Sequence, residues 1–236
     1  MTRLRLAMTL AEAKNIAGNL GHPSKMPGYS YGLDARRCRT GNVLAGKPGS
    51  VCSSCYARNA FYATWVPLSK GHAKRHDGLE HPRWCDAMVR LVEHYCAPPQ
   101  NFFRWHDSGD LQDALHFAKI IEVCSRTPAV SHWLPTREYH IVADVLRSSV
   151  RIPENLCVRL SAHMIDTEPV IPDELRDVLA DLPTSTVHTC HGHPVITPRE
   201  RKGAIECIAV EARDNICGPC RACWSRAVVN VSYPQH

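Results

Sequence analysis

The sequence lacks long apolar runs. Its N-terminal stretch, MTRLRLAMTLAEAKN, contains no apolar core of the length that a signal peptide needs. No other stretch approaches the roughly 20 apolar residues that a membrane-spanning helix requires. Internal repeats and low-complexity segments are missing as well. The sequence therefore predicts a soluble, cytoplasmic globular protein without a membrane partner.

A strong charge of either sign is also missing. The formal net charge is +5, and the basic residues are scattered, with short clusters at RLR, DARRCR and PRERK. A nucleic-acid-binding protein is expected to show a coherent basic stripe with exposed aromatic residues, and the sequence shows none. The composition does not support a nucleic-acid partner, but it permits a small-molecule or nucleotide-like substrate that carries negative charge.

Cysteine, by contrast, is abundant. Twelve cysteines in a cytoplasmic chain of 236 residues do not indicate a disulfide framework. Cys190, in the stretch TCHGHP, is ambiguous. Seven others form two groups with regular spacing. The remaining four lie inside predicted helices or strands and are expected to be small buried apolar residues: Cys85, Cys96, Cys124 and Cys157.

Strand-like and helix-like segments alternate along most of the chain. Strands are predicted at 28–34, 101–107, 129–135, 155–163, 185–190 and 204–210. Amphipathic helices are predicted at 83–96, 112–126, 138–149 and 173–182. This alternation predicts an α/β fold with a parallel sheet. Six units in about 180 residues fit a partial (β/α)6 TIM-like barrel better than a full barrel of about 250 residues.

We assign residues 1–206 to this barrel and residues 207–236, after the last predicted strand, to a C-terminal cluster-binding extension of the same compact domain. In such folds the functional residues lie at the C-terminal ends of the strands. Polar stretches follow four consecutive predicted strands: HDSGD, PTRE, SAH and CHGH. They predict one shared mouth. Most histidines near strand ends are expected to be packing or surface residues, whereas His106 and His132 are expected to line the mouth.

The C-terminal cysteine group has the spacing of cluster ligands. Cys217, Cys220 and Cys223 follow C-x2-C-x2-C, the spacing that opens bacterial ferredoxin sites. Cys207 can supply the fourth thiolate. Four thiolates close a [4Fe–4S] cluster, which suits electron transfer or a structural role.

The N-terminal group has three cysteines, Cys38, Cys52 and Cys55, with the spacing C-x13-C-x2-C. Three thiolates on a cubane leave one iron open to a substrate or cofactor, by the logic of an open catalytic metal position. The alternative is a structural zinc held by these three and one more cysteine, such as Cys190. A thioredoxin-like dithiol is disfavoured, because its C-x2-C should open a helix after the first strand.

Five stretches together resemble a known family. They are SKMPGYSYGLDARRC, GSVCSSCYA, FRWHDSGDL, HWLPTRE and CGPCRACW, and they cover most of the chain. The pattern resembles the radical S-adenosylmethionine (SAM) enzymes, and most closely the phage-encoded radical-SAM-like family called gene product 88. The resemblance implies location in the host cytoplasm, an external electron donor, and reduction of SAM to methionine and a 5′-deoxyadenosyl radical that abstracts hydrogen from a substrate.

The resemblance also implies roles for particular residues. Cys38, Cys52 and Cys55 would hold the SAM-binding [4Fe–4S] cluster. Ser108, Gly109 and Asp110 match the acidic, glycine-rich loop that receives the ammonium of SAM. Arg137 and Ser161 lie where similar enzymes contact the SAM carboxylate or ribose. The implied cofactor-binding residues are therefore Tyr56, Ser108, Gly109, Asp110, Arg137 and Ser161.

The sequence departs from the usual radical SAM pattern, C-x3-C-x2-C with an aromatic residue just before the third cysteine. Here RTGNVLAGKPGSV, which we expect to form a turn, separates the first two cysteines, and Tyr56 follows Cys55. A late glycine-rich adenine motif is not evident. Two alternatives stay open: an iron–sulphur protein on the same scaffold that does not use SAM, and a zinc-stabilised nucleic-acid-binding protein.

Overall fold

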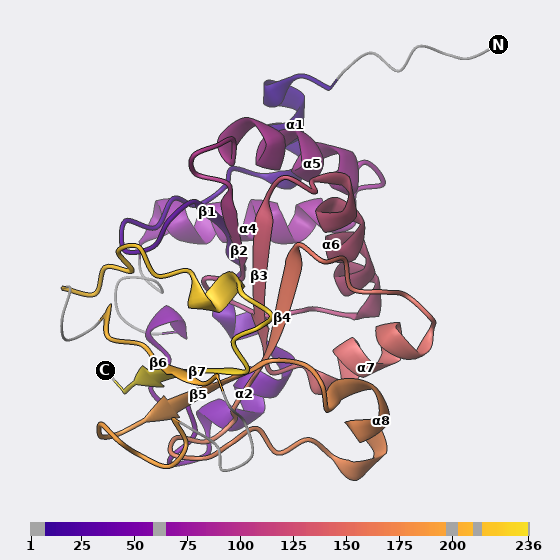
Figure 1. Cartoon of the computed structure of the whole chain (residues 1–236). Helices are drawn as coiled ribbons and strands as arrows, with labels where there is room; N and C mark the ends of the chain where they lie inside the picture. Colours follow the sequence, from indigo (N-terminus) through magenta and orange to yellow (C-terminus); the bar gives the residue numbers. More distant parts are fainter. Residues whose placement is uncertain (1–7, 59–64, 197–202, 210–213, 236) are drawn as a thin grey trace.

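The computed structural model describes residues 8–58, 65–196, 203–209 and 214–235, and it has an α/β fold built on one parallel sheet (Figure 1). Seven strands lie in the order β1-β2-β3-β4-β5-β7-β6, and every described pair is parallel. The predicted α/β class with a parallel sheet is confirmed. The strands are β1 (Tyr29–Tyr31), β2 (Phe102–Trp105), β3 (Ser131–Thr136), β4 (Leu156–Ser161), β5 (Thr184–His188), β6 (Ile205–Glu206) and β7 (Asn230–Pro234).

The predicted helices are present, and the described residues contain three more α-helices. The expected segments correspond to α5 (Trp84–Tyr95), α6 (Ala114–Arg126), α7 (Tyr139–Arg147) and α8 (Arg176–Leu179). The helices that the sequence analysis did not predict are α1 (Leu10–Ala17), α2 (Arg39–Ala45) and α4 (Val66–Gly78). α4 has few apolar residues from which a helix could be predicted. α1 begins with a capping box formed by Thr9 and Glu12, which is a sequence signal for the start of a helix. No described helix is both long and apolar enough to cross a bilayer.

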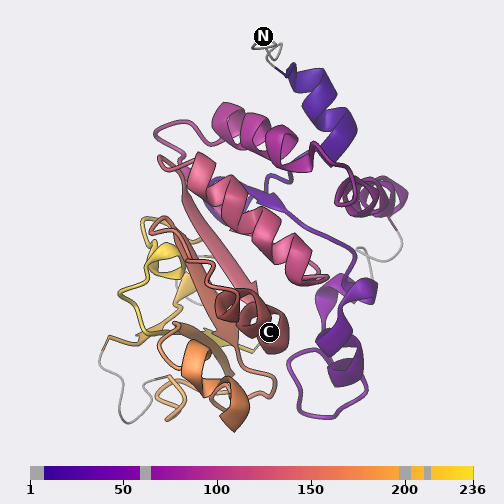
Figure 2. The ribbon, with the colours of Figure 1, turned by 90° about the vertical axis from the view of Figure 1, so that its right-hand side faces the viewer.

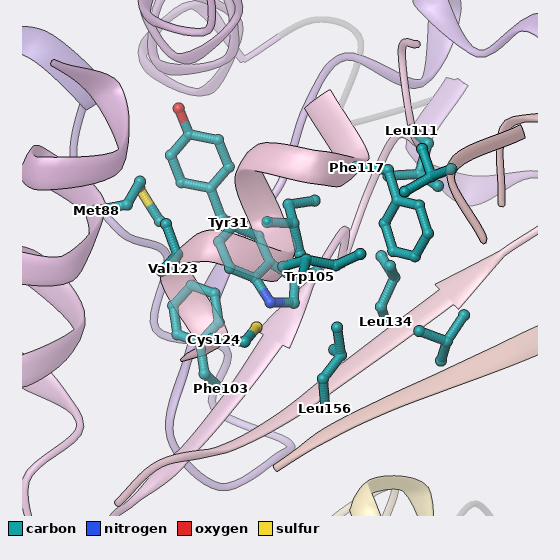
Figure 3. Close-up of a cluster of buried hydrophobic side chains, with 14 of the residues drawn as sticks. Tyr31, Met88, Phe103, Trp105, Leu111, Phe117, Val123, Cys124, Leu134 and Leu156 are labelled. Carbon is teal, nitrogen blue, oxygen red and sulfur yellow. The ribbon is translucent and has the colours of Figure 1, made fainter. Parts of the chain in front are cut away.

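The main core fills the space between the sheet and helices α5, α6 and α7. Figure 3 shows its centre, where Tyr31 of β1 and Phe103 and Trp105 of β2 meet side chains from the helices. All three are fully buried. Burial of side chains of this size contributes about 1.5–3 kcal/mol each. Cys96, Cys124 and Cys157 are buried as predicted, and Cys85 is half-buried.

The opposite face of the sheet is covered by the C-terminal segment, which Figure 2 shows in yellow on the side away from α5 and α6. Trp224, in the short helix η4 (Ala222–Trp224), packs there against Phe102 and Trp133, with ring centroids 5.5 and 5.2 Å apart. Its Nε1 donates to the Phe103 carbonyl at 2.9 Å. The C-terminal segment is thus part of the same packed unit as the sheet.

Two details of the sheet differ from the sequence-based expectation. The cysteine-rich tail does not follow the last strand, because it ends in β7, which inserts between β5 and β6. The predicted strand at 204–210 is reduced to the two residues of β6, and residue 210 lies outside the described part. β7 was missed because its sequence, NVSYP, is short and about half of its residues are polar.

The sheet is open over the described residues, with β1 and β6 at its two edges. A TIM-like barrel is therefore not shown. The face of the sheet opposite to α5, α6 and α7, which we call the inner face, is covered by the C-terminal segment. This covering gives a physical reason for the open sheet. Because Trp224 and its neighbours bury that face, the sheet does not need to close on itself to keep its apolar side chains from water.

Candidate functional site

The predicted mouth corresponds to the C-terminal edge of the sheet, where the segments after β1, β2, β3 and β4 meet. Asp110 joins two of these segments. Its Oδ1 accepts hydrogen bonds from Leu111 N at 2.8 Å and Thr136 Oγ1 at 2.6 Å. Its Oδ2 accepts from Arg137 N at 2.9 Å. Burial raises the pKa of the Asp110 carboxyl to about 6, although the bond from Thr136 opposes the rise.

Ser108 and Gly109 connect the same loop to the end of β1. The Ser108 hydroxyl donates to the Leu33 carbonyl at 2.7 Å, and Leu33 N donates to the Ser108 carbonyl at 2.8 Å. Gly109 has a φ of 77°, and a Cβ there would lie 2.8 Å from the Leu33 Cβ. The close approach requires glycine at this position. The predicted glycine-rich loop thus packs tightly on β1.

Glu138, which follows the predicted Arg137, positions the first cysteine. Cys38 lies between the short helix η1 (Ala35–Arg37) and α2. The Glu138 carboxylate accepts from Thr40 N at 2.9 Å and from Thr40 Oγ1 at 2.8 Å, in the first turn of α2. Glu138 is buried, so this paired contact fixes α2, and with it Cys38, against the end of β3. The expected turn after Cys38 therefore begins with a helix.

The loop that carries Cys52 and Cys55 is fixed at both ends. Val51 N donates to the His163 carbonyl after β4 at 3.0 Å. Tyr56 begins the short helix η2 (Tyr56–Arg58), and its hydroxyl donates to the Asp107 carbonyl after β2 at 2.6 Å. The aromatic residue after the third cysteine is therefore a tether between the cysteine loop and β2.

The three cysteines of the N-terminal group converge. A Cβ on Gly41 would lie 3.5 Å from the Cys38 sulfur and 3.7 Å from the Cys52 sulfur, so both sulfurs face the space above this glycine. Burial raises the pKa of the Cys38 thiol well above its ordinary value, and the charges of Asp110, Cys52 and Cys55 raise it further. Cys55 packs against the small buried cluster that contains Cys38 and Ala57, so it belongs to the same group.

The cysteine thiols suit an iron–sulphur cluster as ligands. Such clusters are held by cysteine thiolates, and a structural zinc commonly uses cysteines as well. The Cys38 and Cys52 sulfurs border the space that a Cβ on Gly41 would fill. The donor set and this space therefore fit an iron–sulphur cluster.

Arg137 supplies a positive charge beside the cysteines. Burial raises the pKa of the Cys52 thiol, and the Arg137 guanidinium is the largest influence that lowers it. Arg137 is held by Nε, which donates to the Ala162 carbonyl after β4 at 3.1 Å. Ser161 is buried one residue earlier, with its Oγ 3.0 Å from Ser185 Oγ. Arg137 thus lies near Cys52, and Ser161 lies within the edge of the sheet.

Two carboxylates, Asp107 and Asp110, follow β2 in the same loop. The Asp110 charge raises the pKa of Cys38 and Cys52, so it lies near both thiols. The Asp107 charge instead raises the pKa of His72 and Arg75, on α4. Of the two carboxylates, Asp110 is the one close to the cysteine group.

The four C-terminal cysteines also form one group. Burial raises the pKa of Cys207, Cys217 and Cys223, and the charges of other members of the group raise it further in each case. The Cys223 thiol, whose pKa is about 12, also lies 3.1 Å from Tyr233 Oη. Cys220 is among the neighbours whose charges act on Cys207 and Cys217. The structure therefore brings together the residues that the C-x2-C-x2-C spacing singled out.

Arg159, which the sequence did not single out, anchors this group to the sheet. It is fully buried in β4, on the face that the C-terminal segment covers. Its guanidinium donates to four backbone carbonyls: Thr184, Ala222, Cys223 and Ser225. Three of these acceptors belong to the cysteine-rich segment, so Arg159 fixes that segment against the inner face.

The two histidines expected to line the mouth do not do so. His132 lies near the beginning of β3, at the opposite edge of the sheet, and it is fully buried against Phe103 and Trp105. His106 does follow β2, but its ring packs against His116 of α6, with ring centroids 5.4 Å apart. The expectation failed for His132 because the residue lies at the beginning of its strand, and for His106 because sequence position does not give the direction in which a side chain points.

A known protein family matches most of the chain. A family model described as "Gene product 88" matches residues 5–226 of the chain. Its description names no reaction, cofactor or substrate. No curated protein and no solved structure gave a match. Because the match extends over nearly the whole chain and over both cysteine groups, the chain belongs to the gene product 88 family, as its sequence motifs suggested.

Proposed function

We propose that this protein is a radical-SAM-type iron–sulphur enzyme with two [4Fe–4S] clusters. Cys38, Cys52 and Cys55 would hold the first cluster at the C-terminal edge of the sheet. Cys207, Cys217, Cys220 and Cys223 would hold a second, auxiliary cluster on its inner face. When bound and reduced, the first cluster would supply the electron that splits SAM, and the radical formed would abstract hydrogen from a substrate.

One observation carries the proposal: three cysteines converge where the strand ends meet, beside a cationic side chain. Three thiolates leave one iron of a cubane without a protein thiolate, so a ligand with an amino and a carboxylate group can bind there. The match to the gene product 88 family covers the residues of both cysteine groups.

The neighbouring residues have charges that suit SAM. Arg137 lies beside Cys52 and would pair with the SAM carboxylate. Asp110 Oδ2 accepts one hydrogen bond from the protein and would accept a second from the SAM ammonium. Tyr56, Ser108, Gly109 and Ser161 hold the surrounding loops and strand edge, so we assign them to shaping the site.

The strand order is the observation that supports our finer proposal of a partial barrel, which the open sheet does not itself show. Its strands follow one another in order from β1 to β5, with helices on the outer side and the C-terminal segment on the inner side. We propose that the protein works in the cytoplasm, in the host cytoplasm if it is phage-encoded, with an external electron donor. The second candidate function is an iron–sulphur protein that binds another ligand at the open iron.

Iron analysis tests the clusters. After anaerobic reconstitution we expect about eight iron and eight sulphide per chain, which is two cubanes. Cys52→Ala with Cys55→Ala should remove about half of the iron, and Cys217→Ala with Cys220→Ala should remove the other half. If neither pair of changes removed iron, the ligand assignment would be wrong.

Electron paramagnetic resonance tests SAM. We expect SAM to change the signal of the reduced protein in the variant that lacks the C-terminal cluster, and not in the variant that lacks the N-terminal cluster. Dithionite should then yield 5′-deoxyadenosine slowly. Unchanged spectra with saturating SAM and no 5′-deoxyadenosine would remove SAM from the proposal and leave the second candidate function.

A further inference from the structure

A second kind of metal ligand set lies at the other end of the same sheet edge. His188 ends β5, His191 follows it by three residues, and Glu206 ends β6. One donor atom from each of the three lies within 4.8 Å of the other two. His188 Nε2 is 2.9 Å and His191 Nδ1 is 2.5 Å from Glu206 Oε1. Two imidazoles and a carboxylate therefore face a common point.

The His188 ring is built into the fold with one nitrogen left for a ligand. Its side chain is 1% exposed. Its Nδ1 lies 2.7 Å from the Ser232 hydroxyl in β7, the strand between β5 and β6. Its Nε2 is inaccessible to water and has no hydrogen bond of acceptable geometry within the described residues, although Glu206 is near. This nitrogen is therefore aimed into the space that the three donors share.

From this geometry we propose a mononuclear site for a divalent first-row transition ion at His188, His191 and Glu206. Neutral imidazole and carboxylate are ligands that suit zinc and ferrous iron. The Ser232 contact matches the usual support of a metal-bound histidine, in which the ring nitrogen away from the metal donates to a neighbouring group. Ligand atoms around a tetrahedral ion lie about 3.3 Å apart, so a small rotation of the Glu206 side chain suffices.

The site shares no ligand with either cysteine group. It joins β5 and β6 across β7 at the edge of the sheet, where Glu206 lies opposite Ser232. The loop between the histidines is held by Asp166, which accepts from Thr189 N at 2.8 Å and from Thr189 Oγ1 at 2.7 Å. His193, in the same loop, lies 3.6 Å from Asp166 and outside the donor set.

Zinc content measured beside iron content tests the site. The reconstituted protein is dialysed against Zn²⁺ and then against metal-free buffer, and both metals are counted. We expect one zinc per chain, which His191→Ala and Glu206→Gln remove while iron and sulphide stay unchanged. His193→Ala is the matched control and should keep the zinc. Ser232→Ala should weaken zinc binding about 10- to 100-fold.

The cysteine variants separate this site from the proposed function. Cys52→Ala with Cys55→Ala, and Cys217→Ala with Cys220→Ala, should lose iron and keep the zinc. Zinc that is lost only in the cysteine variants would overturn the proposal, since the ion would then occupy a thiolate site. So would zinc that survives both His191→Ala and Glu206→Gln, zinc that is lost in His193→Ala, or a wild-type protein that binds no zinc.

Discussion

Gly41 shows how one residue without a side chain makes room beside the cysteines. It lies in α2, where alanine would ordinarily be preferred by about 1 kcal/mol. A Cβ at this position would lie 2.8 Å from the Cys38 Cβ, and both the Cys38 and Cys52 sulfurs face it. The helix therefore gives up intrinsic stability at the one position where a methyl group would enter the proposed cluster site.

This conflict between helix stability and space gives a prediction. Gly41→Ala should displace Cys38, because its Cβ would lie 2.8 Å from the Cys38 Cβ, and should remove about half of the reconstituted iron, while the helix preference of alanine, about 1 kcal/mol, offsets part of the cost of this shift. Gly46→Ala is the control, since a Cβ there meets nothing nearer than the Val43 carbonyl at 3.9 Å. Iron analysis and thermal unfolding check the pair. Full iron in Gly41→Ala would show that the space beside Cys38 is not the cluster site.

Buried histidines give the protein a predictable response to acid. Burial lowers the pKa of His132 to about 3, below the value of about 6.5 expected in the unfolded chain. The unfolded state therefore binds more protons between these values. The contribution of neutral His132 to stability is complete above pH 6.5 and is lost as the pH falls below it, at up to about 1.4 kcal/mol per pH unit.

We therefore expect His132→Gln to reduce the acid sensitivity of the fold. The wild type should lose about 2 kcal/mol more than the variant between pH 7.5 and pH 5. Urea unfolding at the two pH values measures this, and His140→Gln, at an exposed position on α7, is the control. Equal losses in wild type and His132→Gln would contradict the assignment of a neutral buried imidazole.

At the scale of elements, α2 depends on a partner from a distant strand. It has seven residues, too few to be stable alone, and Cys38 at its N-terminus makes no side-chain capping bond. The Glu138 carboxylate, after β3, binds the backbone and hydroxyl of Thr40 in its first turn. A negative charge at a helix N-terminus is favourable, so this contact holds α2 in place.

Glu138→Gln is accordingly expected to loosen Cys38 without unfolding the sheet. An amide cannot accept both bonds from Thr40 as a carboxylate does, and loss of a hydrogen bond to a charged group costs roughly 1.5–3 kcal/mol. Iron from the N-terminal cluster should pass to a chelator more than tenfold faster than in wild type. Glu154→Gln, at an exposed position, is the control. Identical rates would mean that Thr40 does not fix the cysteine.

At the scale of the whole molecule, the C-terminal segment and the sheet form one unit through Arg159. This buried side chain binds four carbonyls, three of them in the cysteine-rich segment. Removal of the guanidinium would leave buried carbonyls without donors, and each such group costs about 1–3 kcal/mol. The inner face of the sheet would also lose the segment that covers it.

Arg159→Met is therefore expected to lower the free energy of unfolding by about 3 kcal/mol or more. Arg147→Met is the control, because Arg147 pairs with Asp177 at the surface, and such pairs contribute about 1 kcal/mol or less. Denaturant unfolding of the two variants decides the matter. Similar losses in both would show that the C-terminal segment is not anchored through Arg159.

The sequence predicted the α/β class, the parallel sheet and four helices. These follow from local periodicity. It did not predict β7 between β5 and β6, because strand order is decided by packing across the whole sheet. It misplaced His132, which lies at the beginning of β3 and not at its C-terminal end. It missed the Glu138 contact with Thr40, which joins residues far apart in sequence.

The insertion of β7 between β5 and β6 also matters during synthesis. Two parallel strands need a long crossover connection, usually a helix. Here the connection from β6 to β7 contains Cys217, Cys220 and Cys223. β7 leaves the ribosome after β5 and β6 and must dock between them, and a bound cluster would shorten its search by closing the connecting loop. Cofactor supply in the cell would then set how quickly newly made chains complete their sheet.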